Sequence, residues 1–151
     1  MATKTFNPNK NRRFILPPEK YQKKFLKYLF WYSSIDDIAK NEDLNTIYKN
    51  LPKRLRKILP NGSIVLPTKK ELNNMTSFDF SSDRLYGTRW NDCSQPIAFL
   101  RHLRNSIAHG YIQQSGKKWL IDDENEKGEI TAKGVINIST IDSLFDELLR
   151  Q

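Results

Sequence analysis

The sequence is poor in the residues from which disulfide frameworks and metal centres are built. It contains one cysteine, Cys93, and only two histidines, His102 and His109, in 151 residues. One thiol cannot form an internal disulfide or a thiolate metal cage. The two histidines also lack the His-x-x-x-His spacing of helical zinc sites. We therefore expect a protein without disulfides, a bound metal or another cofactor.

Long apolar runs are also missing. No stretch approaches the roughly 20 apolar residues that a membrane-spanning helix needs, and the first residues lack the hydrophobic segment of a secretory signal. With 38% hydrophobic and 28% charged residues, the composition is typical of a soluble protein. We expect a cytoplasmic protein without membrane contact. Its length favours one domain, predicted over residues 17–151, after a flexible basic arm over residues 1–16.

Positive charge is abundant and unevenly placed. The net charge is +8; residues 1–60 hold 14 Lys and Arg against 5 Asp and Glu, whereas residues 111–151 hold 5 against 8. A basic surface raises the local concentration of polyanions and so favours nucleic acid as a partner. Solvated lysines on a small basic protein explain the same excess, so charge alone leaves both interpretations open.

Helical periodicity dominates the chain. Apolar spacing predicts five main helical segments, the second of them divided at Pro52: 17–32, 44–58, 68–75, 94–110 and 139–149. Ser33 or Ser34 is predicted to begin a further short helix. Residues 77–92 show no sustained period and are predicted to form a loop. A hairpin over 111–121 and a strand over 130–138 are expected. The predicted fold is mainly α, a helical bundle with a small β-hairpin or three-stranded appendage before the C-terminal helix.

The helix predicted over 94–110 carries an unusual set of polar residues. At about 100° per residue, Arg101, Asn105 and His109 follow one another along the border of the apolar face. His102 stands near His109, seven residues earlier. Arg104 falls within the apolar arc itself. A helix that only buried a core face would not need this cluster.

Ordinary roles exist for the members of this cluster. Arg104 could be a partly buried arginine paired with a carboxylate, and His109 could be a histidine at a helix C-terminus. Their combination with Asn105 is harder to explain in this way. Arg104 and His109 lie about 140° apart on a straight helix, so they do not form a pair there. Either the helix opens at His109, or a second copy supplies the missing member across a twofold axis; we favour the second.

The side-chain types fit metal-free cleavage of RNA. Histidine moves protons at neutral pH, and arginine presents a fork that matches phosphate and its developing charge. Asparagine can orient either group. The ribose 2′-hydroxyl would attack the adjacent phosphate, with Arg104, His109 and Asn105 as the catalytic set. Basic and polar residues expected to support RNA binding are Arg101, His102, Lys53, Arg54, Arg56 and Lys57.

The run Leu103-Arg104-Asn105-Ser106-Ile107-Ala108-His109-Gly110 resembles the signature of the HEPN superfamily. The resemblance implies a helical bundle whose dimers join two motifs into one metal-independent ribonuclease site, with Arg104 and His109 as the catalytic pair. It implies an endoribonuclease of toxin–antitoxin or phage-defence type, acting as a homodimer through the 94–110 helix. Some members only bind RNA or dimerise, so a non-catalytic RNA- or partner-binding dimer is the alternative.

The continuation His109-Gly110-Tyr111 resembles the His-x-Tyr pattern of toxin members that are partnered by a minimal nucleotidyltransferase. By that resemblance the antitoxin would silence the protein by nucleotidylating Tyr111. An ordinary role for Tyr111 as a strand aromatic also accounts for its position. The sequence alone leaves both roles open.

Overall fold

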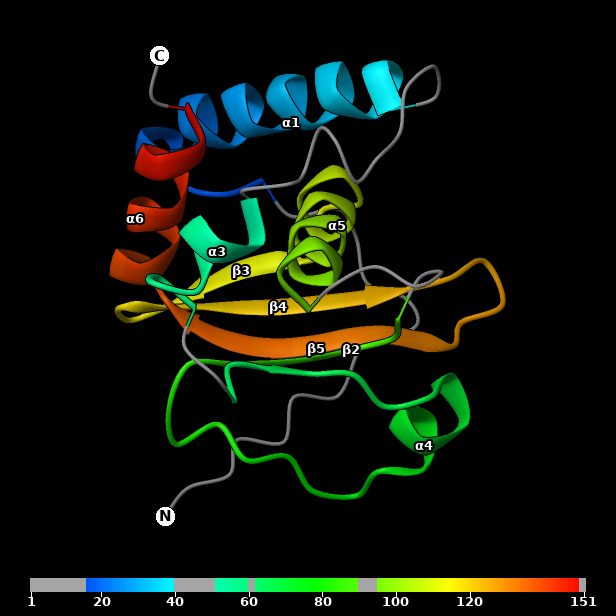
Figure 1. The fold of residues 1–151 in the computed structure, drawn as a ribbon. Helices are drawn as coiled ribbons and strands as arrows, with labels where there is room; N and C mark the ends of the chain where they lie inside the picture. The colour runs from blue at the N-terminus through cyan, green and yellow to red at the C-terminus, as the bar shows by residue number, and fades with distance from the viewer. Residues whose placement is uncertain (1–15, 40–50, 60–61, 90–94, 150–151) are drawn as a thin grey trace.

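A computed structural model describes residues 16–39, 51–59, 62–89 and 95–149. A five-stranded sheet lies at its centre, with the longer helices on one face and a short helix with its flanking loops on the other (Figure 1). The helices are α1 (Glu19–Ala39), α3 (Leu51–Leu55), α4 (Lys69–Asn74), α5 (Gln95–Ala108) and α6 (Ile138–Leu149). The strands are β1 (Ile64–Val65), β2 (Arg84–Gly87), β3 (Ile112–Ser115), β4 (Lys118–Glu124) and β5 (Ile130–Asn137).

The sheet is mixed and has the strand order β1-β2-β5-β4-β3. β1 runs parallel to β2, and the other neighbouring pairs are antiparallel. β3 and β4 form the predicted hairpin, in which Ser115 pairs with Lys118. β5 then lies between β4 and β2, so the last strand in the sequence is the middle strand of the sheet. The sheet is therefore assembled from segments on both sides of α5.

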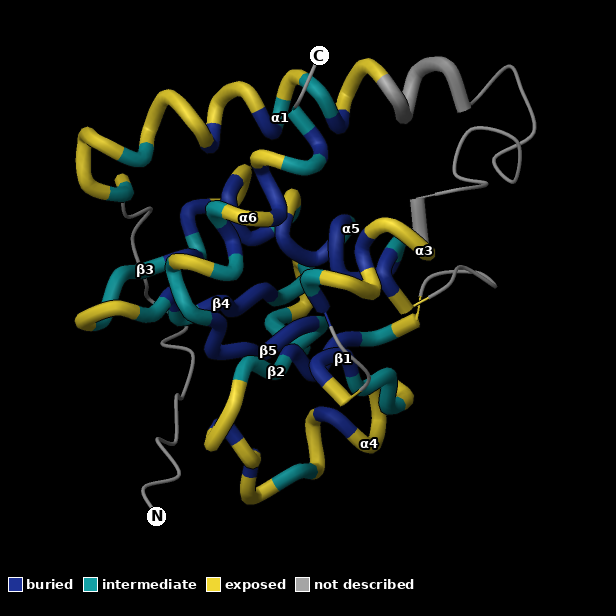
Figure 2. Tube along the Cα trace, turned by 60° about the vertical axis from the view of Figure 1, so that its left-hand side comes forward, coloured by how far each residue is buried: buried dark blue, intermediate teal, exposed yellow. Residues whose placement is uncertain are grey.

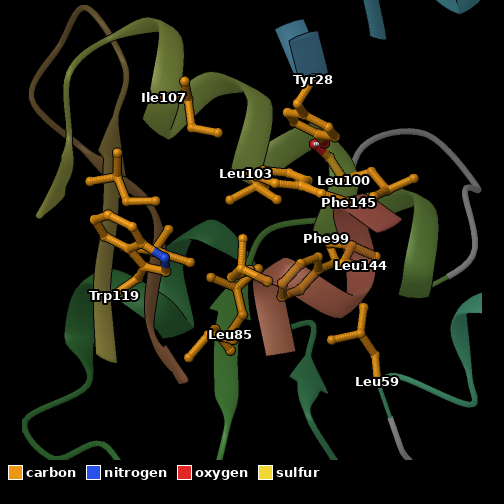
Figure 3. Close-up of a cluster of buried hydrophobic side chains, with 14 of the residues drawn as sticks. Tyr28, Leu59, Leu85, Phe99, Leu100, Leu103, Ile107, Trp119, Leu144 and Phe145 are labelled. Atoms are coloured by element: carbon orange, nitrogen blue, oxygen red, sulfur yellow. Dashed lines mark hydrogen bonds between the residues drawn. The ribbon is translucent and has the colours of Figure 1, made fainter. Parts of the chain in front are cut away.

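The larger core lies between the sheet and the helices. Trp119 of β4 is fully buried, and its ring meets those of Tyr21 and Phe25 on α1 at centroid distances of 4.9 and 5.1 Å. The hydroxyl of Tyr28 donates to the backbone oxygen of Leu100 at 2.6 Å, which ties α1 to α5 (Figure 3). Aromatic packing and this buried hydrogen bond together place α5 between α1 and the sheet.

The opposite face of the sheet is also covered. A second apolar cluster consists of Leu72, Phe78, Phe80, Tyr86 and Val135. In Figure 2 most of β4 and β5 is accordingly coloured as buried. A strand covered on both faces has little reason to alternate between apolar and polar residues.

This central sheet makes the predicted fold class wrong. We expected a mainly α bundle with a small appendage, but the structure contains a five-stranded mixed sheet around which the helices pack. β1 and β2 were missed because they have only two and four residues, and β2 also lies within residues 77–92, which show no period. The break predicted at Ser33 or Ser34 is also wrong, since α1 continues to Ala39. Residues 1–15 of the predicted arm lie outside the described residues.

Other local predictions are confirmed. Thr68 caps α4, and its Oγ1 accepts a hydrogen bond from the backbone N–H of Glu71 at 3.1 Å, as the capping pattern indicates. The hairpin, the strand from Ile130 and the final helix are present. Within the described part of the chain, no helix combines the length and apolar character needed to cross a membrane.

Candidate active site

A tight turn ends α5 and determines where His109 lies. Gly110 has a φ of 72°, a left-handed conformation that glycine adopts without steric cost. The backbone N–H of Gly110 donates to Ile107 at 3.2 Å, and that of Tyr111 donates to Ser106 at 2.7 Å. These two bonds form a Schellman cap. His109 therefore stands just beyond the last helical residue, where the chain turns towards β3.

The imidazole of His109 is held by a buried carboxylate. Its Nδ1 lies 2.8 Å from Oδ1 of Asp123 on β4, and the side chains are 48% and 4% exposed respectively. The other carboxylate oxygen of Asp123 accepts a hydrogen bond from Oγ1 of Thr131 at 3.2 Å. An ionised carboxylate only accepts, so neutral His109 carries its proton on Nδ1. Nε2 is then the nitrogen that can take a proton from a substrate.

Strand alternation explains why Asp123 meets α5. Trp119 and Ile121 of β4 are fully buried in the core beneath the helices, and Asp123 lies on the same face two residues further on. The predicted hairpin ended at residue 121, whereas β4 continues to Glu124, so Asp123 was missed as a functional residue. Trp119, Ile121 and Asp123 stand at every second position, and this alternation could have predicted that Asp123 lies on the buried face of a strand. It was masked because a charged residue seldom lies in a buried strand.

Arg104 and Asn105 lie on the last turns of α5, close to His109 in the chain. The guanidinium Nη1 of Arg104 donates to Oδ1 of Asn105 at 2.8 Å. The backbone oxygen of Asn105 accepts from the backbone N–H of His109 at 2.8 Å. Asn105 thus contacts one member of the predicted pair through its side chain and the other through its backbone.

The expectation that Arg104 falls within the buried arc is wrong, because its side chain is exposed. The buried face of α5 instead includes His102 and Ser106, with exposures of 4% and 0%. Ser106 Oγ donates to the backbone oxygen of His102 at 2.8 Å. Because both polar residues are buried, the buried face of α5 is rotated away from Arg104. The buried face predicted from hydrophobicity alone was therefore misplaced.

His102 packs against β2 inside the protein. Its Nε2 lies 2.6 Å from the backbone oxygen of Thr88, and a carbonyl oxygen only accepts, so Nε2 carries the proton. Burial lowers the pKa of His102, against the opposing effect of the Thr88 bond. A Cβ built on Gly87 would lie 2.5 Å from the imidazole. The ring is therefore internal, not on the surface where we expected it to support RNA binding.

Arg101, also predicted to support RNA binding, is partly buried on α5. The remaining predicted RNA-binding residues lie on another element. Lys53, Arg54, Arg56 and Lys57 are exposed on α3 and the turn after it. Arg54 binds α6, with its Nε 2.7 Å from the carboxylate of Glu147. Arg104, Asn105 and His109 follow one another at the end of α5, and these cations lie on a separate element.

A cleft opens beside His109. It has a volume of about 720 Å³ and lies between the end of α5, α4 and the loop that joins β4 to β5. Its lining residues are Lys69, His109, Tyr111, Glu124, Asn125, Glu126, Lys127 and Glu129. The Tyr111 ring meets the His109 ring edge-on at a centroid distance of 6.1 Å. Nucleotidylation of Tyr111 stays a prediction. The described ranges contain no group of three or more potential metal ligands.

Comparison with known proteins extends the resemblance well beyond the motif. The family model described as HEPN pEK499 p136 matches residues 13–150. No curated protein and no solved structure gave a significant match. The matched range contains the sheet, all described helices and the cluster at the end of α5. A match over nearly the whole chain cannot arise from a short arginine–histidine pattern alone, and the chain therefore belongs to the HEPN pEK499 p136 family.

Proposed function

We propose that this protein is a metal-independent endoribonuclease in which His109 moves the proton and Arg104 binds the scissile phosphate. The observation that carries the proposal is the half-exposed imidazole of His109 fixed by the buried carboxylate of Asp123. A histidine needed only for packing would not require an ionisable partner inside the sheet. An orienting carboxylate that sets the tautomer is what a general base requires.

The reaction follows from these groups. Nε2 of His109 accepts the proton of the ribose 2′-hydroxyl while the 2′-oxygen forms a bond to the adjacent phosphorus. The bond from phosphorus to the 5′-oxygen breaks, and that oxygen receives the proton from the imidazolium formed at His109. The products are a 2′,3′-cyclic phosphate and a 5′-hydroxyl. The guanidinium of Arg104 stabilises the negative charge that grows on the phosphate oxygens.

The complete site is a composite of two copies. Arg104 projects from the regular part of α5, whereas His109 is turned towards β4 by the cap at Gly110. A homodimer formed through the 94–110 segment would bring Arg104 of one copy to His109 of the other. Such a ribonuclease would serve as a toxin or phage-defence effector, with a minimal nucleotidyltransferase as its antitoxin.

The first test is RNA cleavage in excess EDTA by the wild type, Arg104→Ala and His109→Ala. His109→Ala removes proton transfer, which costs roughly 10²- to 10⁴-fold in rate, and Arg104→Ala removes the charge that stabilises the phosphate. Each variant should therefore lose cleavage while circular dichroism reports an intact fold. Lys23→Ala, which removes an exposed cation on α1, is the control and should cut nearly as well as the wild type. Cleavage by His109→Ala at the wild-type rate would overturn the assignment.

A second experiment tests the composite site. Arg104→Ala and His109→Ala proteins are co-expressed with different tags, and the mixed dimer is purified through both tags. One composite site in the mixed dimer keeps Arg104 from one copy and His109 from the other, so activity should return to about half. Should the mixed dimer stay inactive while both parents dimerise, the two residues would act within one subunit or not at all.

The alternative function is RNA binding without chemistry. It is favoured by the exposed cations Lys53, Arg56 and Lys57, which lie apart from the motif. Such binding would weaken steeply with salt. Replacing these two lysines and one arginine by alanine would then reduce affinity more than His109→Ala does, and no product would form.

A further inference from the structure

The cleft beside His109 is large enough to hold one nucleotide. Its volume of about 720 Å³ lies within the range of roughly 300 to 1,000 Å³ that small-molecule sites occupy. His109 and Tyr111 form the side nearest α5, and the loop between β4 and β5 forms the opposite side. An RNA whose phosphate lies at His109 would therefore place a neighbouring base at the mouth of this cleft.

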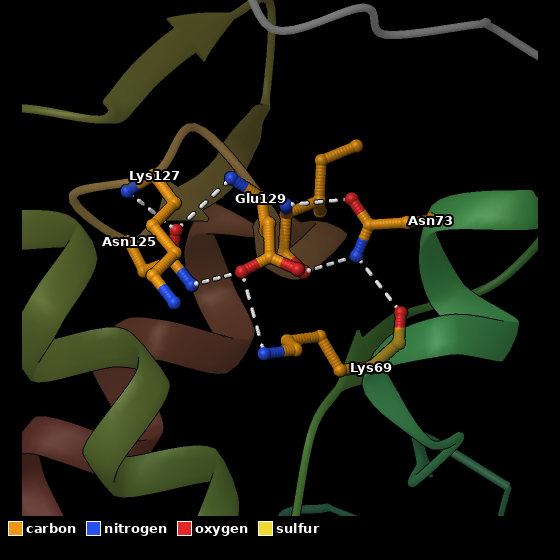
Figure 4. Close-up of polar contacts among 6 residues, drawn as sticks. Lys69, Asn73, Asn125, Lys127 and Glu129 are labelled. Atoms are coloured by element: carbon orange, nitrogen blue, oxygen red, sulfur yellow. Dashed lines mark hydrogen bonds and ion pairs between the residues drawn. The ribbon is translucent and has the colours of Figure 1, made fainter.

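The wall opposite His109 is held in place by its own hydrogen bonds. Oδ1 of Asn125 accepts the backbone N–H groups of Lys127 and Glu129 at 2.9 and 3.0 Å. The carboxylate of Glu129 accepts from Asn125 Nδ2 at 3.0 Å and lies 3.3 Å from Lys69 Nζ of α4 (Figure 4). These contacts close the loop on itself and fasten it to α4. The cleft is thus preformed and need not be ordered by its ligand.

A second attachment comes from Asn73, also on α4. Its Nδ2 donates to the backbone oxygen of Ile130 at 3.0 Å, and its Oδ1 accepts the backbone N–H of Ile130 at 2.8 Å (Figure 4). The amide therefore satisfies both backbone groups at the start of β5. The end of the loop and α4 are joined at two separate points.

The charges in the cleft differ from those on α5. The cleft lining holds three carboxylates, those of Glu124, Glu126 and Glu129, against two amines, those of Lys69 and Lys127. The amine of Lys69 is paired with Glu129. Carboxylates repel the phosphates of an RNA backbone but accept hydrogen bonds from base amino groups, as a carboxylate does from N4 of cytosine. Uracil offers a single N3–H donor between two carbonyl oxygens, and both oxygens repel a carboxylate. The ring of Tyr111 adds a surface on which an unstacked base can lie.

We propose that this cleft is a base-binding subsite that prefers nucleobases with an exocyclic amino group, namely cytosine, adenine and guanine, over uracil. It binds the base next to the phosphate that Arg104 and His109 contact. Tyr111 provides stacking for any base, and the carboxylates of Glu124 and Glu126 accept from the amino group. The proposal rests on the proposed function, because it assumes that His109 lies at the scissile phosphate.

Binding of nucleoside 3′-monophosphates tests the subsite without catalysis. Calorimetry on the full chain should give cytidine, adenosine and guanosine 3′-monophosphates roughly three- to tenfold higher affinity than uridine 3′-monophosphate, which corresponds to one hydrogen bond to a charged group near solvent. Amide resonances of the 124–129 loop should shift on titration. Equal affinities, or tightest binding of the uridine nucleotide, would overturn the proposal.

Variants separate the contribution of the carboxylates from that of stacking on Tyr111. Glu124→Gln and Glu126→Gln, made singly and together, should reduce the preference towards equality, whereas Glu19→Gln at the start of α1 is the matched control and should keep it. Tyr111→Ala should weaken all four nucleotides by about the same factor, and Tyr111→Phe should restore binding. A preference that survives the double glutamine variant would contradict the role of the carboxylates.

The same data distinguish this inference from the proposed function. If the nucleotides bind with the expected preference but the protein never cleaves RNA, the base-binding subsite is supported and the nuclease function is contradicted. If cleavage depends on His109 but neither nucleotide binding nor the product ends show a base preference, the nuclease function is supported and the base-binding subsite is contradicted.

Discussion

The two histidines of α5 and its cap lie seven residues apart and have opposite surroundings. His102 is 4% exposed and donates from Nε2 to the backbone oxygen of Thr88. His109 has a side chain that is 48% exposed, and its Nδ1 meets the carboxylate of Asp123. Each partner only accepts, so the two neutral rings are protonated on different nitrogens.

This difference shows that the partner of a histidine decides what the ring can do. A backbone carbonyl anchors His102 in a packed site, where burial lowers its pKa. A carboxylate orients His109 and leaves Nε2 on the exposed side of the ring. Both histidines appeared in the sequence as candidates for the same site, and only one of them stands on the surface. The following experiments test this contrast, from the largest expected effect to the smallest.

The largest effect on stability is expected at His102. His102→Ala removes a buried ring and should lower the free energy of unfolding by about 2 to 4 kcal/mol, because a cavity is left against β2. Gly87→Ala should also destabilise, by about 1 to 3 kcal/mol, since its Cβ would meet the imidazole at 2.5 Å. Urea denaturation measures both effects.

The energetic coupling between His102→Ala and Gly87→Ala tests the contact between the two residues more directly than either single change does. Once the ring is gone, the added methyl group of Gly87→Ala has space, so the double variant should be more stable than the sum of the two single changes predicts. Simple additivity would mean that His102 and Gly87 do not press on one another in the folded protein.

The next effect concerns the orientation of His109. Asp123→Asn keeps the size of the side chain but removes the charge that sets the tautomer, and should reduce RNA cleavage by roughly 10- to 100-fold. Nitrogen-15 NMR should report Nδ1–H for His109 and Nε2–H for His102 in the wild type, with only His109 changed in the variant. An unchanged His109 tautomer, or unchanged cleavage, would contradict the role given to Asp123.

The pH dependence of stability should report His102. Its pKa in the folded state is lowered by burial, so below about pH 6.5 the unfolded chain binds a proton that the folded protein does not. The free energy of unfolding should therefore fall as the pH drops from about 6.5 towards 5, by up to about 1.4 kcal/mol per pH unit. His102→Gln, whose amide can still donate to Thr88, should show a smaller slope over this range. An equal slope would assign the effect to other groups.

The smallest effect is expected at Thr131. Its hydroxyl donates to the second oxygen of Asp123 at 3.2 Å, and Thr131→Val should cost about 0.5 to 1.5 kcal/mol of stability. Cleavage should fall only a few-fold, because the bond from Asp123 to His109 remains. Thr140→Val, which removes a hydroxyl bound to Asp83, is a control for the loss of a hydroxyl group remote from His109. A larger loss of cleavage in Thr131→Val than in Asp123→Asn would contradict the proposal that Thr131 acts on His109 only through Asp123.

Local patterns predicted much of the chain. The helix at the motif, its end at residue 110, the hairpin after it and the short helix from residue 68 were all predicted, because each depends on residues close in sequence. The sheet was not foreseen as the centre of the fold. β1 and β2 are short; β1 pairs with β2 across 21 residues of sequence, and β2 pairs with β5 across 45 to 51 residues. Asp123 was missed for the same reason, since its partner His109 lies on another element.

The amino-acid sequence by itself determined that Arg104, Asn105 and His109 follow one another at the end of one helix, because helical periodicity and a glycine cap act over a few residues. Tertiary structure alone decided which of the two histidines is exposed, that Arg104 lies outside the core, and that a carboxylate from the sheet reaches His109. Those outcomes depend on how α5 is rotated against β2 and β4. That rotation is set by packing among distant segments, including the space that Gly87 leaves for His102.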